Sequence, residues 1–223
     1  MFMSNRAIPP LLAPRESEPL WIEPSQARSR ARVERILAAA RELLGEHGLV
    51  GLTMDAVARR ADIPIGSLYQ FFPDRNALIA RLFHAQLMAT DALVMEALSG
   101  ARSMAELRKN IATLPRALYR YIADAPALVE IWRAVQSIRA LRHLDTDDSR
   151  RMGLALFEAI RGQKGVSVDE ARLARACFLV CDLLGAVVQA ALEQDPAEGW
   201  ELVEEWVLMA ESYFDRILAN RDS

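Results

Sequence analysis

Cysteine and histidine are scarce in this sequence, and their scarcity excludes several classes of protein. The 223 residues include only two cysteines, Cys177 and Cys181, so the disulfide framework of a small secreted domain is excluded. The three histidines lie far apart, and none has a metal-ligand spacing. Glycine-rich phosphate loops and nucleophile-elbow motifs are absent as well. We therefore expect no catalytic site, no metal and no cofactor, and a reducing, cytoplasmic setting.

Long apolar runs are also missing, with one partial exception. The stretch "ACFLVCDLLGAVVQAAL", residues 176–192, is near the lower length limit for a membrane span, but it contains Asp182 and Gln189. The N-terminus lacks the basic-then-apolar layout of a signal peptide. A helix buried on most sides by protein explains the apolar stretch better, so we predict no membrane partner.

Helical periodicity fills the chain from Gln26 onward. Apolar residues recur at three- and four-residue steps, without strand alternation or a repeat of fixed period. The pattern predicts an all-α protein of about nine helices, with segments at 29–47, 54–61, 65–72, 74–98, 104–123, 126–142, 147–161, 168–193 and 197–219. Residues 1–25 hold five of the ten prolines and little periodicity, which predicts a flexible tail.

Several residues mark where helices are expected to begin or end. Gly48 suits a left-handed position after the first helix. Thr53 and Asp74 are expected N-caps, because a hydroxyl or carboxylate oxygen can accept from the free N–H groups of the first turn. The cluster "DTDDS", residues 145–149, lacks a calcium-loop layout and is interpreted as a capping region.

The first three helical segments follow the order of a helix-turn-helix, whose last helix enters the major groove of DNA. In that last segment, Gly66 and Ser67 are small enough to allow close approach to the DNA backbone. Tyr69 can donate its hydroxyl to a phosphate, and Gln70 can pair with a base edge, best with adenine. The apolar residues expected to anchor the segment in the core are Ile63, Leu68 and Phe72.

Charge is unevenly distributed along the chain. Residues 26–81 carry nine Arg against six acidic residues, a net charge of +3, whereas residues 82–223 carry 16 Lys or Arg against 21 acidic residues, a net charge of −5. A basic module on an acidic body is compatible with nucleic-acid binding by one end, although solvated helix faces give a similar difference. Arg75 can neutralise a phosphate, and Arg28 and Arg30 can reach the DNA backbone or minor groove.

The stretch "LTMDAVARRADIPIGSLYQFFPDRNAL", residues 52–78, resembles the DNA-binding region of the tetracycline-repressor (TetR) family of bacterial transcription regulators. The motif-bearing resemblance covers roughly residues 29–80, and the rest of the chain is similar in length and helical character. The residues at matching places are Thr53, Ala58, Gly66, Ser67, Leu68, Tyr69, Phe72 and Arg75. Three positions depart from the family pattern. Asp62 replaces a usual Gly but tolerates a left-handed turn, Pro64 replaces a polar cap, and Ile65 replaces a base-facing polar residue.

The resemblance implies a ligand-responsive transcriptional regulator, expected to be a repressor. It implies a homodimer that binds a palindromic double-stranded operator and is released by a small apolar or aromatic effector. The implied domains are a tail (1–25), a homeodomain-like helix-turn-helix domain of three helices (26–75) and an effector-binding and dimerisation domain (76–223). The predicted DNA contacts are Thr53, Met54, Ile65, Gly66, Ser67, Tyr69, Gln70, Arg75, Arg28 and Arg30. Two alternatives remain, an enzyme or a non-DNA interaction protein on a similar scaffold.

The body of the protein is predicted to hold the effector pocket and the dimer interface. By resemblance, the middle helices enclose the pocket, whose candidate lining residues are Met88, Tyr119, Trp132, Gln136, Met152, Phe157 and Asp182. The last two helices carry apolar residues on more sides than one neighbour covers, which favours a four-helix interface between two copies over packing inside one protomer. The candidate interface residues are Val180, Leu184, Val187, Val188, Val203, Trp206, Ala210 and Phe214.

Overall fold

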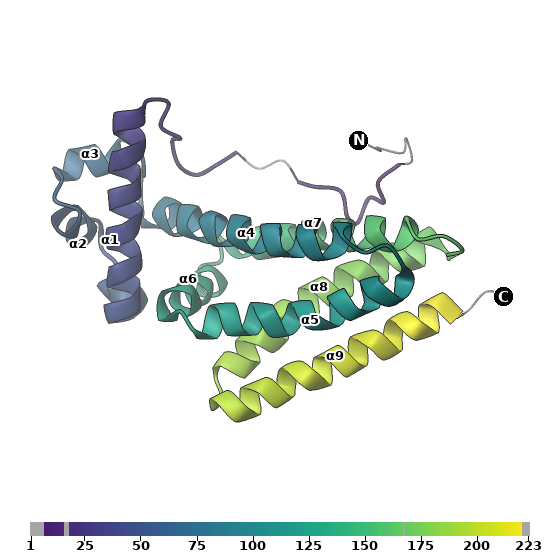
Figure 1. Ribbon diagram of the computed structural model, residues 1–223. Coiled ribbons are helices and arrows are strands. Elements are labelled where there is room, and N and C mark those ends of the chain that lie inside the picture. The colour runs from purple at the N-terminus through teal and green to yellow at the C-terminus, as the bar shows by residue number, and fades with distance from the viewer. Residues whose placement is uncertain (1–6, 16–17, 167, 220–223) are drawn as a thin grey trace. The chain divides into compact units, whose positions relative to one another are not determined.

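The computed structural model describes residues 7–15, 18–166 and 168–219, and within these ranges the chain forms nine α-helices and no strand (Figure 1). The prediction of an all-α protein is confirmed, and each predicted segment corresponds to one helix. The helices are α1 (Ala27–Gly51), α2 (Met54–Arg60), α3 (Ile65–Tyr69), α4 (Arg75–Ser99), α5 (Met104–Ala123), α6 (Pro126–Ser137), α7 (Arg142–Arg161), α8 (Glu170–Leu192) and α9 (Pro196–Ala219).

By their internal contacts the described residues divide into two compact units. Unit 1 draws on residues 7–15, 90–121, 146–166 and 168–219, and unit 2 draws on residues 18–89 and 122–145. This division differs from the sequence-based boundary at residues 75 and 76, since α6 belongs to unit 2. The reason is close helix packing, because a Cβ added to Gly45 of α1 would lie 3.7 Å from the Cβ of Ala127 in α6.

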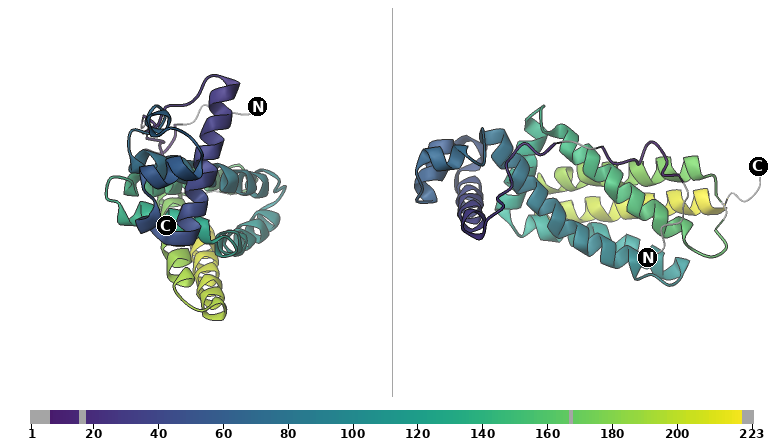
Figure 2. Two further views of the ribbon diagram at one scale, coloured as in Figure 1. Left: turned by 90° about the vertical axis from the view of Figure 1, so that its left-hand side faces the viewer. Right: turned by 90° about the horizontal axis from the view of Figure 1, so that it is seen from above.

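Unit 2 contains the three helices of the helix-turn-helix motif (Figure 2, left). The apolar stripe of α1 is buried as its periodicity predicts, through Val33, Ile36, Leu37, Ala40 and Leu44. Gly48 interrupts α1 with φ 61° and ψ −165°, a region that only glycine adopts without strain. The structure therefore has a kink at Gly48, but not the left-handed helix end that the sequence predicts, and the chain continues as one further helical turn to Gly51.

The predicted caps of unit 2 are present. The Thr53 hydroxyl oxygen accepts a hydrogen bond from the Ala56 N–H at 3.2 Å, and a carboxylate oxygen of Asp74 accepts from the Ala77 N–H at 2.8 Å. Asp62, between α2 and α3, has φ 52°. It therefore takes the left-handed conformation that Asp tolerates better than most residues.

Besides the end of α1, which is at Gly51 instead of His47, three element boundaries differ from the prediction by three residues or more. Helix α3 ends at Tyr69, because the Phe71 and Phe72 N–H groups both bond to the Leu68 carbonyl and Pro73 follows. Helix α6 ends at Ser137 instead of Arg142. Helix α7 begins at Arg142, so the "DTDDS" cluster lies inside the helix instead of before it. Its aspartates take part in ion pairs within the helix, such as Asp147 with Arg150 three residues on.

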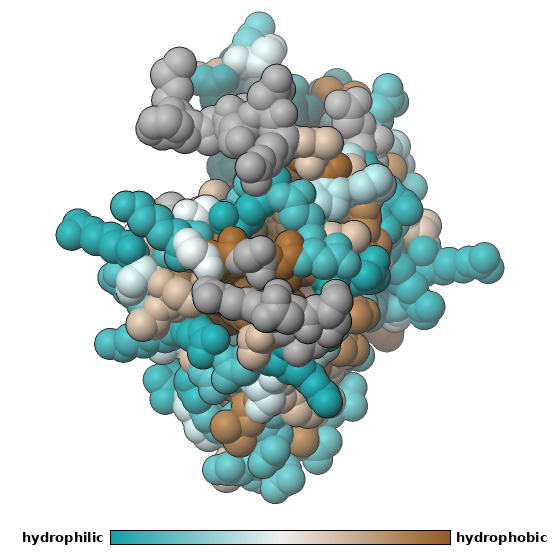
Figure 3. All heavy atoms as spheres, turned by 90° about the vertical axis from the view of Figure 1, so that its right-hand side faces the viewer, coloured by the Kyte–Doolittle hydropathy of each residue, from teal (hydrophilic) through white to brown (hydrophobic). Residues whose placement is uncertain are grey.

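Unit 1 is built around α8 and α9, which lie side by side (Figure 1). Asp169 caps α8 by accepting from the Ala171 N–H at 2.8 Å, and Asp195 caps α9 by accepting from the Ala197 N–H at 3.1 Å. An Arg116–Glu204 ion pair at 2.6 Å joins α5 to α9. Hydrophilic side chains cover most of the face drawn in Figure 3, and hydrophobic surface is visible in separate areas between them.

The described parts of the predicted N-terminal tail contact the folded units. Leu12 is fully buried in unit 1, where it lies against Gly153 of α7. In unit 2, the Ile22 N–H donates to the Phe71 carbonyl at 2.9 Å. A freely flexible tail would not make these contacts. Burial of large apolar side chains such as Leu12, and of part of Trp21, stabilises them by removing apolar surface from water.

Candidate nucleic-acid interface and effector cavity

Helix α3 is anchored on one side and open on the other. Leu68 and Phe72 are fully buried and Ile63 is half-buried, so the predicted anchor residues lie on the inner side. On the outer side Tyr69 is 50% exposed and Ile65 is 38% exposed. Because the inner side chains fix the helix to the core, the outer ones are held at defined positions on the protein surface.

The other predicted contact residues of α3 lie on the same open side. Gln70 is exposed and Ser67 is half-buried. A Cβ added to Gly66 would meet no atom within 4 Å, and the backbone there is helical. Neither internal packing nor backbone conformation therefore requires glycine at this position.

The remaining predicted contacts flank α3. Thr53 is exposed at the start of α2, and Met54 and Arg75 are half-buried. Arg28 is exposed near the start of α1, and an Arg30 guanidinium nitrogen donates to the Ser25 carbonyl at 2.7 Å. All ten predicted contact residues belong to unit 2. Their role in DNA binding stays a prediction.

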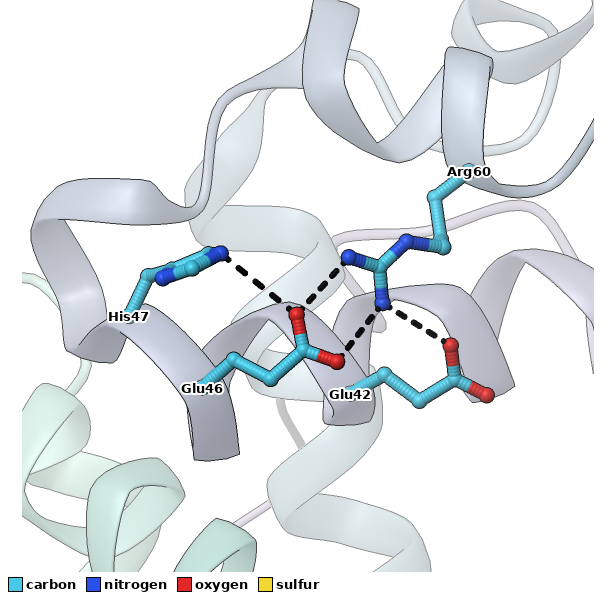
Figure 4. A network of polar contacts seen from close by, with 4 residues as sticks. All are labelled: Glu42, Glu46, His47 and Arg60. Atoms are coloured by element: carbon cyan, nitrogen blue, oxygen red, sulfur yellow. Dashed lines mark hydrogen bonds and ion pairs between the residues drawn. The ribbon is translucent and has the colours of Figure 1, made fainter.

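An ion-pair network fixes α2 against α1 (Figure 4). Arg60, in the last turn of α2, donates to both carboxylate oxygens of Glu46, at 3.0 and 2.8 Å, and to Glu42 at 3.1 Å. His47 lies 3.4 Å from the Glu46 carboxylate. The hydrogen bonds from Arg60 lower the pKa of Glu46 from its ordinary value of 4.5. The network thereby restrains the short helix that precedes α3.

Unit 1 contains a small apolar cavity of about 40 Å³. Five helices contribute to its walls, and no charged side chain does. The lining residues are Val94, Leu98, Ile111, Leu114, Pro115, Met152, Leu156, Val180, Cys181, Leu184 and Trp206. Met152 is therefore the one predicted pocket residue that lines this cavity.

The other predicted pocket residues lie at several places. In unit 1, Phe157 is fully buried, Asp182 is half-buried, and Tyr119 is buried with its ring 6.3 Å from that of Trp200. In unit 2, Met88 is 43% exposed, and the Gln136 amide donates to Asp145 at 2.6 Å. Trp132 is buried, and its indole N–H has no hydrogen-bond partner among the described residues, which is rare in a folded protein.

The two cysteines occupy an apolar environment in α8. Burial raises the pKa of Cys177, and burial together with the nearby carboxylates of Asp148 and Asp182 raises the pKa of Cys181 to about 12. Both thiols therefore stay protonated at neutral pH, and the thiolate is the reactive form.

The structure buries most of the predicted dimer residues inside one chain. Val187 is half-buried, and the other seven are at most 7% exposed. The seven buried side chains are therefore part of the hydrophobic core of unit 1. The large apolar residues of the same two helices that are exposed are Leu179, Leu183, Leu208, Met209 and Tyr213.

The sequence interpretation did not identify Arg60, Cys181 or these exposed residues as parts of a site. Arg60 pairs with residues 14 and 18 positions away, so no local spacing reveals the pair. The exposed and buried apolar residues of α8 alternate around a helix that is apolar on nearly every side, so periodicity alone does not separate them.

Comparisons with known proteins agree with this arrangement. Residues 36–82 match the family model "Bacterial regulatory proteins, tetR family", and residues 106–218 match "Tetracyclin repressor-like, C-terminal domain". The TetR-family regulator from Streptomyces coelicolor has a solved structure that matches with a TM-score of 0.65 and 26% identity, covering 86% of this chain and 99% of that one. A TetR-family regulator from Pectobacterium atrosepticum shares the fold, with a TM-score of 0.63 and 20% identity over 87% of this chain and 98% of that one.

Two curated relatives are also similar. The HTH-type transcriptional repressor KstR of Mycobacterium tuberculosis is 33% identical over 92 residues, which are 41% of this chain and 42% of KstR. The match therefore spans less than half of KstR. The HTH-type transcriptional regulator BetI of Rhizobium meliloti is 24% identical over 204 residues, 89% of this chain and 96% of BetI.

Regulators of the TetR family bind operator DNA, act as dimers with small-molecule effectors and are in general soluble cytoplasmic proteins without enzymatic activity. Two helices here, α4 and α8, have the length and composition of membrane spans, as core helices of soluble proteins also do. The C-terminal family model alone matches half of the chain, and the N-terminal model matches the helix-turn-helix. The chain belongs to the tetracycline-repressor (TetR) family of bacterial regulatory proteins.

Proposed function

We propose that this protein is a homodimeric, ligand-responsive repressor that binds a palindromic operator through α3. The observation that carries the proposal is the two-sided character of α3, whose inner side chains are buried while Tyr69 and Gln70 face solvent. A helix held in this way can present its outer face to a major groove. Repression is favoured because the KstR relatives are named repressors.

Ile65 gives α3, the helix proposed to read the DNA sequence and called the reading helix below, an apolar side chain where the family has a polar one. Its side chain is exposed beside Gly66, so it is available to a thymine methyl group but cannot read a hydrogen-bond pattern. We expect Gln70 to supply the hydrogen-bonded contact with a base, and Tyr69 to donate to a phosphate. Arg28, Arg30 and Arg75 add charge for the DNA backbone.

A gel-shift titration with the intergenic DNA beside the protein's own gene tests DNA binding. Tyr69→Phe should weaken binding to all DNA sequences alike, and Gln70→Ala should also relax the preference for the operator. Tyr121→Phe, which changes an exposed tyrosine of α5, is the matched control and should bind as the unchanged protein does. Failure to bind such DNA at low salt, where phosphate attraction is strongest, contradicts the proposal.

The apolar cavity of unit 1 is the proposed effector site. Its present volume of about 40 Å³ holds little more than a water molecule, whereas pockets for small molecules measure roughly 300–1,000 Å³. An effector must therefore move the surrounding helices apart. Val94 and Leu98 place α4 in the cavity wall, and α4 begins at Arg75, directly after the reading helix.

This connection suggests how the effector acts on DNA binding. A molecule that favours the widened cavity shifts α4 and, with it, the spacing of the two reading helices in a dimer. We expect the effector to be apolar or aromatic, because no charged residue lines the cavity. A small molecule that raises the melting temperature without changing operator affinity at saturation is not the effector.

The proposed dimer face is the exposed apolar surface of α8 and α9. Leu183 is 51% exposed and Met209 is 68% exposed, which is unusual for large apolar side chains on two neighbouring helices. A second copy of the same two helices would cover them in a two-fold interface. Sedimentation of the purified protein gives its mass directly, and a monomer at micromolar concentration contradicts this part of the proposal.

A further inference from the structure

A second and larger cavity lies in unit 2, beneath the N-terminal segment 18–23. Its volume is about 360 Å³, against about 40 Å³ for the apolar cavity of unit 1 that is lined by Met152. The segment forms one wall, and residues 80–87 of α4 and the first turn of α7 form the others. A volume of this size lies within the range of small-molecule pockets.

Specific contacts hold the segment in place over the cavity. The Trp21 ring lies 5.4 Å from the His84 ring, and the Arg81 guanidinium lies 5.7 Å from the centre of the Trp21 ring. The Trp21 indole N–H donates to Glu23 at 2.6 Å, and Glu23 pairs with Arg81 at 3.2 Å. Aromatic, cation–π and ionic contacts thus fix the segment to α4.

The walls of the cavity combine aromatic rings with negative charge. Trp21, Phe83, His84 and His143 supply rings, and leucine, proline and alanine side chains supply most of the remaining surface. The two carboxylates of the lining belong to Glu18 and Glu23, and no Lys or Arg lines the cavity. Glu23 is already paired with Arg81, whereas Glu18 is exposed and has no hydrogen bond or ion pair among the described residues.

We propose that this cavity is a second ligand site, which binds a small planar aromatic amine in its protonated form. The ring of the ligand lies against Trp21 and Phe83, and its ammonium group faces Glu18. An aromatic carboxylate is disfavoured, because Arg81 is already paired with Glu23 and the carboxylate of Glu18 would repel a second negative charge. A cation is attracted to aromatic faces, and more strongly the further it is desolvated.

The position of the segment links this site to the reading helix. The Ile22 N–H donates to the Phe71 carbonyl, two residues after the end of α3. A ligand that shifts the segment therefore acts on the backbone that follows α3. The consequence for operator affinity depends on the function proposed above, but binding of the ligand does not.

Isothermal titration of the full-length protein with 1-naphthylmethylamine at neutral pH tests the site without DNA. We expect saturable binding of one molecule per chain. Trp21→Ala should weaken this binding by about tenfold or more, which corresponds to about 1.4 kcal/mol. Trp21→Phe should weaken it by only a few-fold, because phenylalanine keeps an aromatic ring. The matched control is Trp200→Phe, because Trp200 contacts Tyr119 and Arg120 in unit 1 and not this cavity.

The charge preference is tested separately. Glu18→Gln should weaken binding of 1-naphthylmethylamine several-fold and leave binding of the uncharged 1-naphthylmethanol unchanged, while Glu201→Gln, an exposed carboxylate of α9, should change neither. Circular dichroism establishes that each variant is folded, and Trp21→Phe carries the test if Trp21→Ala is not. Absence of binding at millimolar concentration, equal binding by Trp21→Ala, or tighter binding of 1-naphthoate overturns the proposal.

Discussion

Gly66→Ala should raise the stability of the fold and lower the affinity of the protein for DNA. The structure places no atom within 4 Å of the added methyl group, and the glycine lies in ordinary helical backbone, so the substitution causes neither a clash nor strain. Alanine is favoured over glycine inside a helix by about 0.5–1 kcal/mol. For a chain of this length, that gain corresponds to a rise of about 1–4 °C in melting temperature.

The same methyl group should impair operator binding. It adds bulk to the exposed face of α3, between the positions of the proposed base and phosphate contacts. Loss of one well-made contact costs about 1–3 kcal/mol, which is about 5- to 150-fold in dissociation constant at 25 °C. A fluorescence-anisotropy titration with labelled operator measures this change, and a urea or thermal melt measures the stability.

Gly45→Ala is the matched control for this experiment. Gly45 is an exposed helical glycine of α1, and its added Cβ would make an ordinary contact with Ala127. It should gain helix propensity in the same way but leave DNA binding unchanged. If Gly66→Ala is more stable and binds the operator as well as the unchanged protein, α3 does not present this face to DNA, and the reasoning is refuted. A loss of stability would instead contradict the local geometry.

Four further outcomes are expected. Asp62→Gly should raise the free energy of unfolding by about 0.5–1 kcal/mol, because glycine takes a positive φ without steric cost, and a urea melt showing no gain contradicts this. The Arg60–Glu46 pair should stabilise the protein above pH 4.5 and lose its effect as pH falls through the lowered pKa of Glu46. The difference in melting temperature between the unchanged protein and Arg60→Gln should therefore shrink in acid. Arg59→Gln is the control and should show no such trend. Leu183→Glu should produce monomers in sedimentation without unfolding the chain, and Leu184→Glu, which buries the charge in the core, should unfold it instead. The thiols should react with a disulfide reagent much more slowly in the folded protein than in guanidinium at the same pH, because burial raises the pKa of Cys177 and Cys181. Equal rates would show that solvent reaches this part of α8 in the folded protein.

The helix-turn-helix could be predicted from sequence because its signals are local. Thr53 and Asp74 mark helix starts through hydrogen bonds with neighbouring residues, and the structure bears out both, whereas Gly48 marks a kink inside α1 instead of its end. The anchor positions Leu68 and Phe72 follow from the need of a short helix to be held by its apolar side chains. These features need no information about distant parts of the chain.

The sites in the body could not be predicted in the same way. In α8, Leu183 and Leu184 are adjacent in sequence, but Leu183 is exposed and Leu184 is buried. Their difference depends on which side of the helix α9 and the other helices cover. Likewise, the cavity beneath Trp21 depends on where a proline-rich segment without periodicity comes to lie. Composition and periodicity carry no information on either point.

The packing of α6 with α1 has a consequence for how the chain folds as it is synthesised. Unit 2 needs residues 122–145 as well as 16–89, so it cannot be completed until the ribosome has passed residue 145. At roughly 5–20 residues per second, this takes about 7–30 s. Unit 1 includes residues 168–219 and is completed later still. Until then α6 is missing from its place beside α1, and a truncated chain ending near residue 89 would lack the packing of Ala127 against α1 near Gly45.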